Sequence, residues 1–223
     1  MTFSLVARDA SGAFGSAICS SSPAVAARCV TLADGIGAVN SQNVTDPRLG
    51  PLVIERLRSG LPAQESLDAV TAGAADVAFR QLLVVDADGR AAAYSGERAL
   101  GLFGAAVGSG VAAGGNMLAD AGIPRLMVDA FLAAEGELEQ RLLAAMSAAA
   151  RAGGEAGPVR SAGLSVVRDA GWRVTDLRVD WTEGDPISEL GALLDLWIPQ
   201  RDDYVTRALR PAAAPSYGVP GDE

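Results

Sequence analysis

Residues 2–20 read TFSLVARDASGAFGSAICS, and this stretch decides how the fold begins. Apolar and polar side chains alternate along residues 2–8, and a period of two predicts a β-strand. Residues 9–12, DASG, form a turn cluster, and the apolar run after them predicts the second strand of a hairpin. The sequence therefore predicts antiparallel pairing from its first residues.

The rest of the chain alternates between strand patterns and pairs of helices. Strand patterns recur at residues 29–43, 81–96, 105–113 and 160–180. Helical spacing of apolar side chains appears at residues 46–60 and from Pro62, then around 123–131 and 138–146. Hairpins dominate over strand–helix–strand crossovers, which predicts an α+β protein with antiparallel sheets covered by helices.

The C-terminal region predicts a further helix. Asp185 stands where an N-cap belongs, Pro186 takes the first helical position, and an apolar stripe runs to Trp197. We expect a main domain over residues 1–183 and a helical extension over 184–210, packed on that domain or on a partner subunit. Residues 211–223 are expected to form a flexible tail. The apolar extension with Trp197 predicts a homodimer or a larger homo-oligomer.

Composition excludes several classes of protein. The net charge of −9 and the pI of about 4.6 argue against nucleic acid as a partner, because phosphate binding requires a basic face. No window is long and apolar enough for a membrane span, and the N-terminus lacks a signal-peptide pattern, so a soluble cytoplasmic protein is expected. Cys19 and Cys29 are expected to be buried, small apolar residues.

No cofactor and no metal are expected. Residues 108–113, GSGVAA, match a dinucleotide-binding pattern, but Gly114 and Gly115 follow where a helix should begin. Carboxylates are plentiful, yet no calcium-loop or zinc motif is present.

The catalytic question starts from two missing residue types. The chain contains no histidine, and all 18 of its basic residues are arginines, so serine–histidine, cysteine–histidine and serine–lysine nucleophile systems are excluded. The α-amino group, with a pKa of roughly 7.7–8.0, is the remaining group that titrates near neutrality. If Met1 is removed, Thr2 carries both a hydroxyl nucleophile and its own base. Two alternatives stay open: Thr2 is an ordinary second residue, or carboxylates alone do the acid–base work.

The sequence resembles a bacterial family of unassigned role, domain of unknown function 1028, which is grouped with the N-terminal-nucleophile (Ntn) hydrolases. The matching stretches are TFSLVARDASGAFGSAI, GIGAVNSQNVTDPRLGPLVIERLRSGLPAQESLDAV, RQLLVVDADGRAAAYSG, GGNML, RSAGLSVVRDAGW and DPISELGALLDLW. They cover most of residues 2–197 in the family's order. The resemblance implies a four-layer αββα sandwich of two antiparallel sheets with helices outside.

The same resemblance implies an amidohydrolase that cleaves a small amide or cyclic amide through an acyl-enzyme. Thr2 would be the nucleophile, and Asn116 would donate to the oxyanion. The polar residues expected to bind the substrate are Asn40, Gln42, Arg80 and Ser161. The alternative is a non-catalytic protein of the same fold that binds a small molecule or serves in an assembly.

Overall fold

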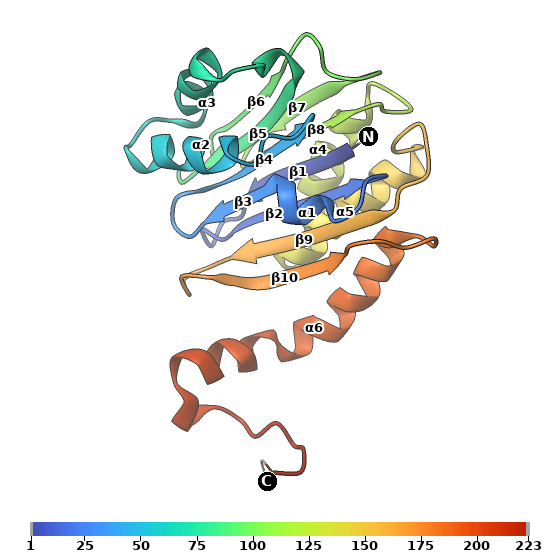
Figure 1. Ribbon diagram of the computed structural model, residues 1–223. Helices are drawn as coiled ribbons and strands as arrows, with labels where there is room; N and C mark the ends of the chain where they lie inside the picture. Colours follow the sequence, from blue (N-terminus) through green and yellow to red (C-terminus); the bar gives the residue numbers. More distant parts are fainter. Residues whose placement is uncertain (1, 222–223) are drawn as a thin grey trace.

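Two antiparallel sheets stack face to face in the computed structural model, which describes residues 2–221 (Figure 1). The larger sheet has the strand order β10-β9-β2-β1-β8-β7, and the smaller has the order β3-β4-β5-β6. The six strands of the first are β1 (Thr2–Arg8), β2 (Phe14–Ser20), β7 (Gly104–Gly108), β8 (Val111–Asn116), β9 (Ser161–Val167) and β10 (Arg173–Val179). The four of the second are β3 (Val30–Ala33), β4 (Gly37–Asn43), β5 (Arg80–Asp86) and β6 (Ala91–Ser95). The N-terminal strand thus lies in the interior of the larger sheet.

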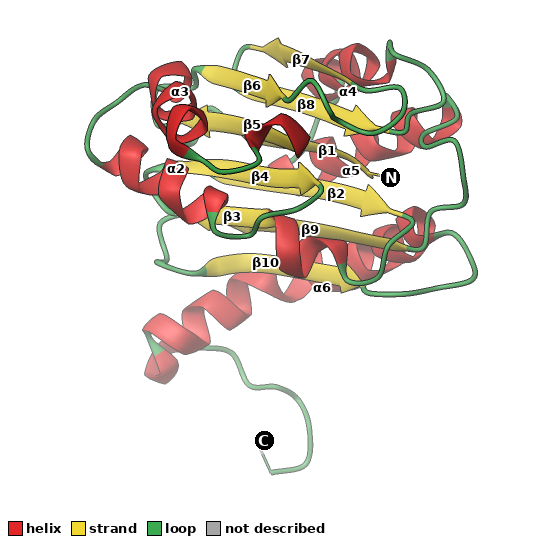
Figure 2. Cartoon of the chain, turned by 45° about the horizontal axis from the view of Figure 1, so that its top comes forward, coloured by secondary structure: helices red, strands yellow, loops and turns green. Residues whose placement is uncertain are grey.

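Helices cover the outer face of each sheet (Figure 2). The larger sheet is covered by α4 (Ile123–Ala133) and α5 (Leu138–Arg151), and the smaller by α2 (Leu49–Arg58) and α3 (Ala63–Gly73). The last helix, α6 (Pro186–Leu209), packs on β10 and then extends away from the body (Figure 1). Three short pieces complete the list: α1 (Val25–Cys29) and the 3-10 turns η1 (Val77–Phe79) and η2 (Pro211–Ala213). The four-layer αββα sandwich expected from the sequence is confirmed.

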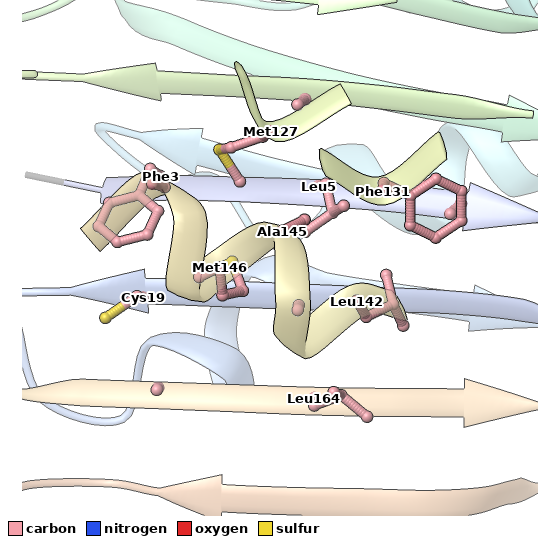
Figure 3. Close-up of a cluster of buried hydrophobic side chains, with 14 of the residues drawn as sticks. Phe3, Leu5, Cys19, Met127, Phe131, Leu142, Ala145, Met146 and Leu164 are labelled. Atoms are coloured by element: carbon pink, nitrogen blue, oxygen red, sulfur yellow. The ribbon is translucent and has the colours of Figure 1, made fainter. Parts of the chain in front are cut away.

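The alternation in β1 explains how its two faces pack. Phe3 and Leu5 point outward into a cluster with Met127 and Phe131 of α4 and Leu142 of α5, and all five are buried (Figure 3). Burial of such a side chain stabilises the fold by about 1.5–3 kcal/mol. The opposite face of β1 points toward the smaller sheet, so the even-numbered residues decide what lies between the sheets.

The space between the sheets is apolar at one end and polar at the other. The apolar end is filled by Val6, Phe14, Ala38, Leu83, Val85, Ala112 and Val167. Thr2 and Ser4, at the start of β1, belong to the polar end, where β4 and β5 contribute amide side chains. The start of β1 is therefore the part of the core where chemistry is possible.

The structure corrects the expected single strand at residues 105–113. This stretch is a hairpin in which β7 and β8 pair through a turn at Ser109–Gly110. Gly110 adopts a left-handed conformation with φ of +69°, and a Cβ there would lie 2.9 Å from the carbonyl oxygen of Arg8. Strand β8 is followed by a loop rather than a helix, so residues 108–113 have none of the geometry of a dinucleotide loop.

The predicted start of the C-terminal helix is confirmed, and Trp197, at the end of its apolar stripe, packs on the domain. The Asp185 carboxylate accepts a 3.0 Å hydrogen bond from the Ile187 amide, as an N-cap does. The Trp197 indole is half-buried and donates to Thr175 Oγ1 at 3.2 Å. The exposed apolar side chains of α6 include Leu196. Of the helices in residues 2–221, none combines the length and apolar character needed to cross a membrane.

A buried ion-pair cluster attaches the second half of α6 to the domain. Glu139 of α5 is fully buried, and its carboxylate accepts hydrogen bonds from Arg168 Nη2 at 2.6 Å, Thr175 Oγ1 at 2.9 Å and Arg201 Nη1 at 3.1 Å. Arg201 is itself buried, so both charged groups of the Arg201–Glu139 pair are removed from water.

We expect Arg201→Ala to lower the free energy of unfolding by about 3 kcal/mol, because it leaves part of the buried charge of Glu139 unpaired. Urea unfolding followed by circular dichroism measures this change. The matched control is Arg125→Ala, which breaks an ion pair with Asp129 whose two side chains are more than half exposed and is expected to cost less than about 1 kcal/mol. Equal losses in the two variants would contradict the assignment of Arg201 as an anchor.

Candidate active site at the start of strand β1

Thr2 is the first residue of β1 and is held between two neighbouring strands. In the register of the sheet it lies opposite Ser20 of β2 on one side and Asn116 of β8 on the other. Side chains of directly paired residues share one face of a sheet, so all three point into the space between the sheets. All three are buried. The nucleophile and oxyanion donor proposed from the sequence therefore lie side by side.

Hydroxyl groups continue from Thr2 along the end of β2. Thr2 Oγ1 lies 3.2 Å from Ser20 Oγ, which lies 2.9 Å from Ser22 Oγ. The Ser22 amide also donates to Ser20 Oγ at 3.1 Å. A serine hydroxyl can orient the threonine hydroxyl but does not accept a full proton near neutral pH. Ser20 therefore positions Thr2 and leaves the role of base to another group.

Behind Asn116, a network of amide side chains joins the two sheets, with Gln81 of β5 at its centre. Gln81 Oε1 accepts from Gln42 Nε2 at 2.8 Å and from Asn116 Nδ2 at 3.4 Å. Gln81 Nε2 donates to Ser95 Oγ at 2.9 Å and to the carbonyl oxygens of Gly115 and Gly104 at 3.1 and 3.2 Å. Gln81 is fully buried, so these bonds fix the orientation of the amide that contacts Asn116.

Two of the predicted substrate-binding residues, Asn40 and Gln42, belong to the contact between the sheets. Gln42 Oε1 accepts from Ser4 Oγ at 2.5 Å, and Asn40 Oδ1 accepts from Ser16 Oγ at 2.8 Å. Asn40 Nδ2 also donates to the Leu5 carbonyl at 3.4 Å. Gln42 is connected through Gln81 to Asn116, the residue opposite Thr2 in the sheet. Asn40 lies farther along β4, toward the apolar end.

The other two predicted binding residues have different surroundings. Ser161 Oγ donates to the Ser22 carbonyl at 2.6 Å and accepts from the Val25 amide at 3.3 Å, so it holds the start of α1 beside the hydroxyl chain. Arg80 donates to the Val44 carbonyl. The pKa of Asp46 is lowered to about 2, mainly by the hydrogen bond from the Arg48 side chain, and the charge of Arg80 makes a smaller contribution. The structure therefore brings Ser161 close to Thr2 and its partners and leaves Arg80 outside this group.

Glu155 is a polar residue of this region that the sequence did not indicate. It lies in the loop between α5 and β9, where it forms a bridge with Leu118, two residues after Asn116. Its side chain is buried, and neither carboxylate oxygen has a hydrogen-bond partner of good geometry within residues 2–221. Burial raises the pKa of Glu155 from its ordinary 4.5 to about 7, while the positive charge of the amino terminus and the Ser21 hydroxyl act in the lowering direction.

Gln81 could have been predicted from the sequence, whereas Glu155 could not. Gln81 shares a strand face with Leu83 and Val85, which pack between the sheets, so the alternation of β5 places it inside. Arg80, its neighbour, is on the other face for the same reason. Glu155 stands in the loop GGEAGPV, and nothing in that composition indicates that its carboxyl group is buried.

Other features of the surface lie away from Thr2. A hollow of about 420 Å³ lies between α2 and α3 and is lined by Asp46, Arg48, Leu49, Leu52, Arg56, Ala69, Val70, Gly73, Ala74 and Ala75. Over the part of the chain that is described, no group of three or more histidine, cysteine, aspartate or glutamate side chains is placed to hold a metal ion. Cys19 and Cys29 are buried free thiols.

Comparisons with known proteins agree with the resemblance noted in the sequence. The model of a family of unknown function, DUF1028, matches residues 2–190. The crystal structure of protein SPO2555 from Silicibacter pomeroyi, which carries the same family designation, superposes with a TM-score of 0.81 at 31% sequence identity. That similarity covers 87% of this chain and 88% of SPO2555. No curated protein matches the sequence.

Two structures of Anbu are more distantly similar. A Gly-1 mutant from Hyphomicrobium sp. strain MC1 has 9% identity and a TM-score of 0.43, over 90% of this chain and 96% of that one. The ancestral beta-subunit from Yersinia bercovieri has 10% identity and a TM-score of 0.42, over 97% and 100%. At these TM-scores neither likeness bears on what this chain does.

We expect Gln81→Leu to lower the free energy of unfolding by at least about 3 kcal/mol, because it leaves several buried donors and acceptors without partners. Urea unfolding measures the loss. The control is Gln64→Leu, an exposed glutamine on α3, which is expected to stay within about 0.5 kcal/mol of the parent. A Gln81→Leu protein as stable as its parent would contradict the role of this network in joining the sheets.

The buried carboxyl of Glu155 predicts a pH dependence of stability. Its pKa is higher in the folded state than the ordinary 4.5, so proton binding favours folding. This contribution is complete below about pH 4.5 and is lost as the pH rises through about 7, a change on the order of 3 kcal/mol. We expect Glu155→Gln to flatten the fall in unfolding free energy between pH 5 and pH 8.

The matched control for that measurement is Glu97→Gln, which changes an exposed carboxyl group. It is expected to leave the pH profile of the parent unchanged. A Glu155→Gln profile that runs parallel to the parent profile would show that Glu155 is not the group responsible.

Proposed function

The chain belongs to the DUF1028 family, and on that premise we propose that it is an N-terminal-nucleophile amidohydrolase whose nucleophile is Thr2. The observation that carries this proposal is the position of Thr2 at the start of an interior strand, between Ser20 and Asn116 in the sheet and with its hydroxyl 3.2 Å from that of Ser20. In a chain without histidine or lysine, the α-amine freed by loss of Met1 is the base available on the same residue.

The reaction follows from these groups. The amine of Thr2 takes the proton of its own hydroxyl, and Oγ1 forms a bond to the amide carbon of the substrate. The resulting tetrahedral intermediate collapses with cleavage of the C–N bond, and the ammonium returns the proton to the leaving nitrogen. Water then attacks the acyl ester with the amine again as base, which releases the acid and restores Thr2.

Asn116 is suited to stabilise the negative oxygen of that intermediate. Its side-chain amide carries two N–H donors, and Nδ2 makes a long contact of 3.4 Å with Gln81. Donors that are fixed in a buried place stabilise developing charge without reorganising, and one such donor contributes about 100- to 1000-fold in rate. The bonds from Gln81 to strands β6, β7 and β8 supply the rigidity.

The burial of Thr2 supports a small substrate. The residue is only 5% exposed, and polar side chains of both sheets fill the space behind it. An amide or cyclic amide of few atoms fits such a place better than a polypeptide does. Amide and hydroxyl side chains surround Thr2, so they could form hydrogen bonds with polar substituents of the substrate.

The test compares Thr2→Ser with Thr2→Ala in hydrolysis of a panel of small linear and cyclic amides. Both replacements are small enough to allow removal of Met1, which intact-protein mass spectrometry verifies for each preparation. We expect Thr2→Ser to retain activity within about tenfold and Thr2→Ala to lose about 1000-fold or more, because only the first keeps a nucleophilic oxygen. Equal activity of the two variants would exclude Thr2 as the nucleophile. Retention of Met1 in native preparations would favour a non-catalytic binding or assembly protein.

A further inference from the structure

Glu155 lies at the same end of the larger sheet as the backbone nitrogen of Thr2. The segment around it is bound to the residues that follow Asn116: the Ala119 amide donates to the Gly154 carbonyl at 3.0 Å, and the Ala156 amide donates to the Met117 carbonyl at 2.9 Å. A Cβ on Gly154 would lie 3.2 Å from the Phe3 ring. The loop that carries Glu155 therefore lies against the first residues of β1.

Two residues next to Ser20, Cys19 and Ser21, interact electrostatically with the Glu155 carboxyl group. Cys19, which pairs with Phe3 across β1 and β2, has its pKa raised by burial first and by the charge of Glu155 second. Ser21 lowers the pKa of Glu155 through its hydroxyl and its backbone amide, although neither meets the geometry of a full hydrogen bond. Figure 3 shows Phe3 and Cys19 on neighbouring strands at one end of the outer core. Glu155 thus approaches the start of β1 from the outer face, opposite to the Thr2 hydroxyl.

A buried carboxyl group without partners is costly, so its presence calls for an explanation. Removing such a group from water costs several kcal/mol unless a cation or several donors compensate for the loss of hydration. Arg168 and Arg201 supply this compensation for Glu139, whereas no arginine is among the groups that affect Glu155. A positive group that acts on Glu155 is the α-amine of residue 1, which is one residue before the amine that Thr2 would expose after loss of Met1.

We propose that Glu155 is the positioning residue of the Thr2 site, and that its carboxyl group pairs with the α-amine that Thr2 exposes after loss of Met1. This proposal depends on the proposed function in one respect: Met1 must be removed so that the α-amine of Thr2 is free. The amine then lies between two groups: its own hydroxyl on the inner face of the sheet and Glu155 on the outer face. The pairing fixes the amine against rotation and stabilises the ammonium that forms when the amine takes the hydroxyl proton.

The titration of the two groups is compatible with this role. Glu155, with a pKa of about 7, and a terminal amine, at roughly 7.7–8.0, can share one proton as either an ion pair or a neutral pair. The neutral pair leaves the amine free to accept the hydroxyl proton. Within residues 2–221, Cys19 is a titratable residue whose pKa is affected by Glu155. Cys19 stays a thiol near neutral pH, because its pKa is raised, with a lesser contribution from Asp185.

The sequence makes the amine unusually easy to measure. Because the chain has no lysine, the α-amine is its only primary amine, and an amine-selective reagent labels one site. The full chain starting at Thr2 is released from an N-terminal ubiquitin fusion, and the rate of N-acetylation by acetic anhydride is followed by mass spectrometry from pH 5 to pH 10. The neutral amine is the reactive form, so the profile gives its pKa without any substrate.

We expect the amine in the parent protein to titrate above the ordinary range and Glu155→Gln to bring it down. Each unit of that decrease raises the acetylation rate at pH 7 by about tenfold. Glu155→Asp keeps the carboxylate and should retain part of the elevation, whereas the exposed control Glu97→Gln should match the parent. A parent amine that titrates at 7.7–8.0, or an unchanged profile in Glu155→Gln, overturns the proposal.

The outcome also separates this inference from the proposed function. A change in the pKa of the amine in Glu155→Gln, with no hydrolysis of any amide, would support the pairing and contradict the amidohydrolase. Hydrolysis that depends on Thr2, with no change in the pKa of the amine, would support the amidohydrolase and contradict the pairing. Where both hold, the pKa on the acidic limb of the kcat/KM profile should decrease in Glu155→Gln by the same amount as the pKa of the amine. If Glu155→Gln fails to fold, the titration of the parent amine alone decides.

Discussion

The hydrogen bonds of Gln81 between the two sheets hold the polar end of the space between them in place. A sandwich core that is polar at one end is stable only if each buried donor and acceptor there has a partner. Gln81 accepts from Gln42 and Asn116 and donates to groups on β6, β7 and β8, so a single side chain links four other strands. Because those strands also determine where Asn116 lies, the position opposite Thr2 is fixed by the same bonds that keep the sheets together.

The location of Thr2 follows from the pairing of β1 rather than from a loop. The residue is paired on both sides, with β2 and with β8, and this pairing restricts the motion of its backbone. The proposed nucleophile is therefore held in place by the sheet itself. The helices α4 and α5 contribute from the outer face, where Phe3 packs into their apolar cluster and holds the next residue of the strand.

Much of the fold could be predicted because its strands alternate clearly and its helices carry regular apolar stripes. The first hairpin and the Asp185 cap are examples in which one side-chain type at one position decides the local structure. The β7–β8 hairpin escaped prediction because glycine and alanine give no contrast between its two faces. The sequence brought forward Thr2 and Asn116, which lie together in the structure; it also predicted Arg80, which lies outside this group, and it did not indicate Gln81. Glu155 could not be found, since burial of a loop carboxyl depends on contacts remote in sequence.

The two buried glutamates among residues 2–221 differ in their electrostatic surroundings. Glu139 receives two arginines and a threonine hydroxyl, and its charge is compensated inside the fold. Glu155 is equally hidden, yet its oxygens have no such donors among residues 2–221. Since folding alone gains nothing from an uncompensated carboxyl group, a replacement at this position would be expected to stabilise the protein. The proposed pairing with the amine of Thr2 gives this carboxyl group a role that accounts for its cost to folding.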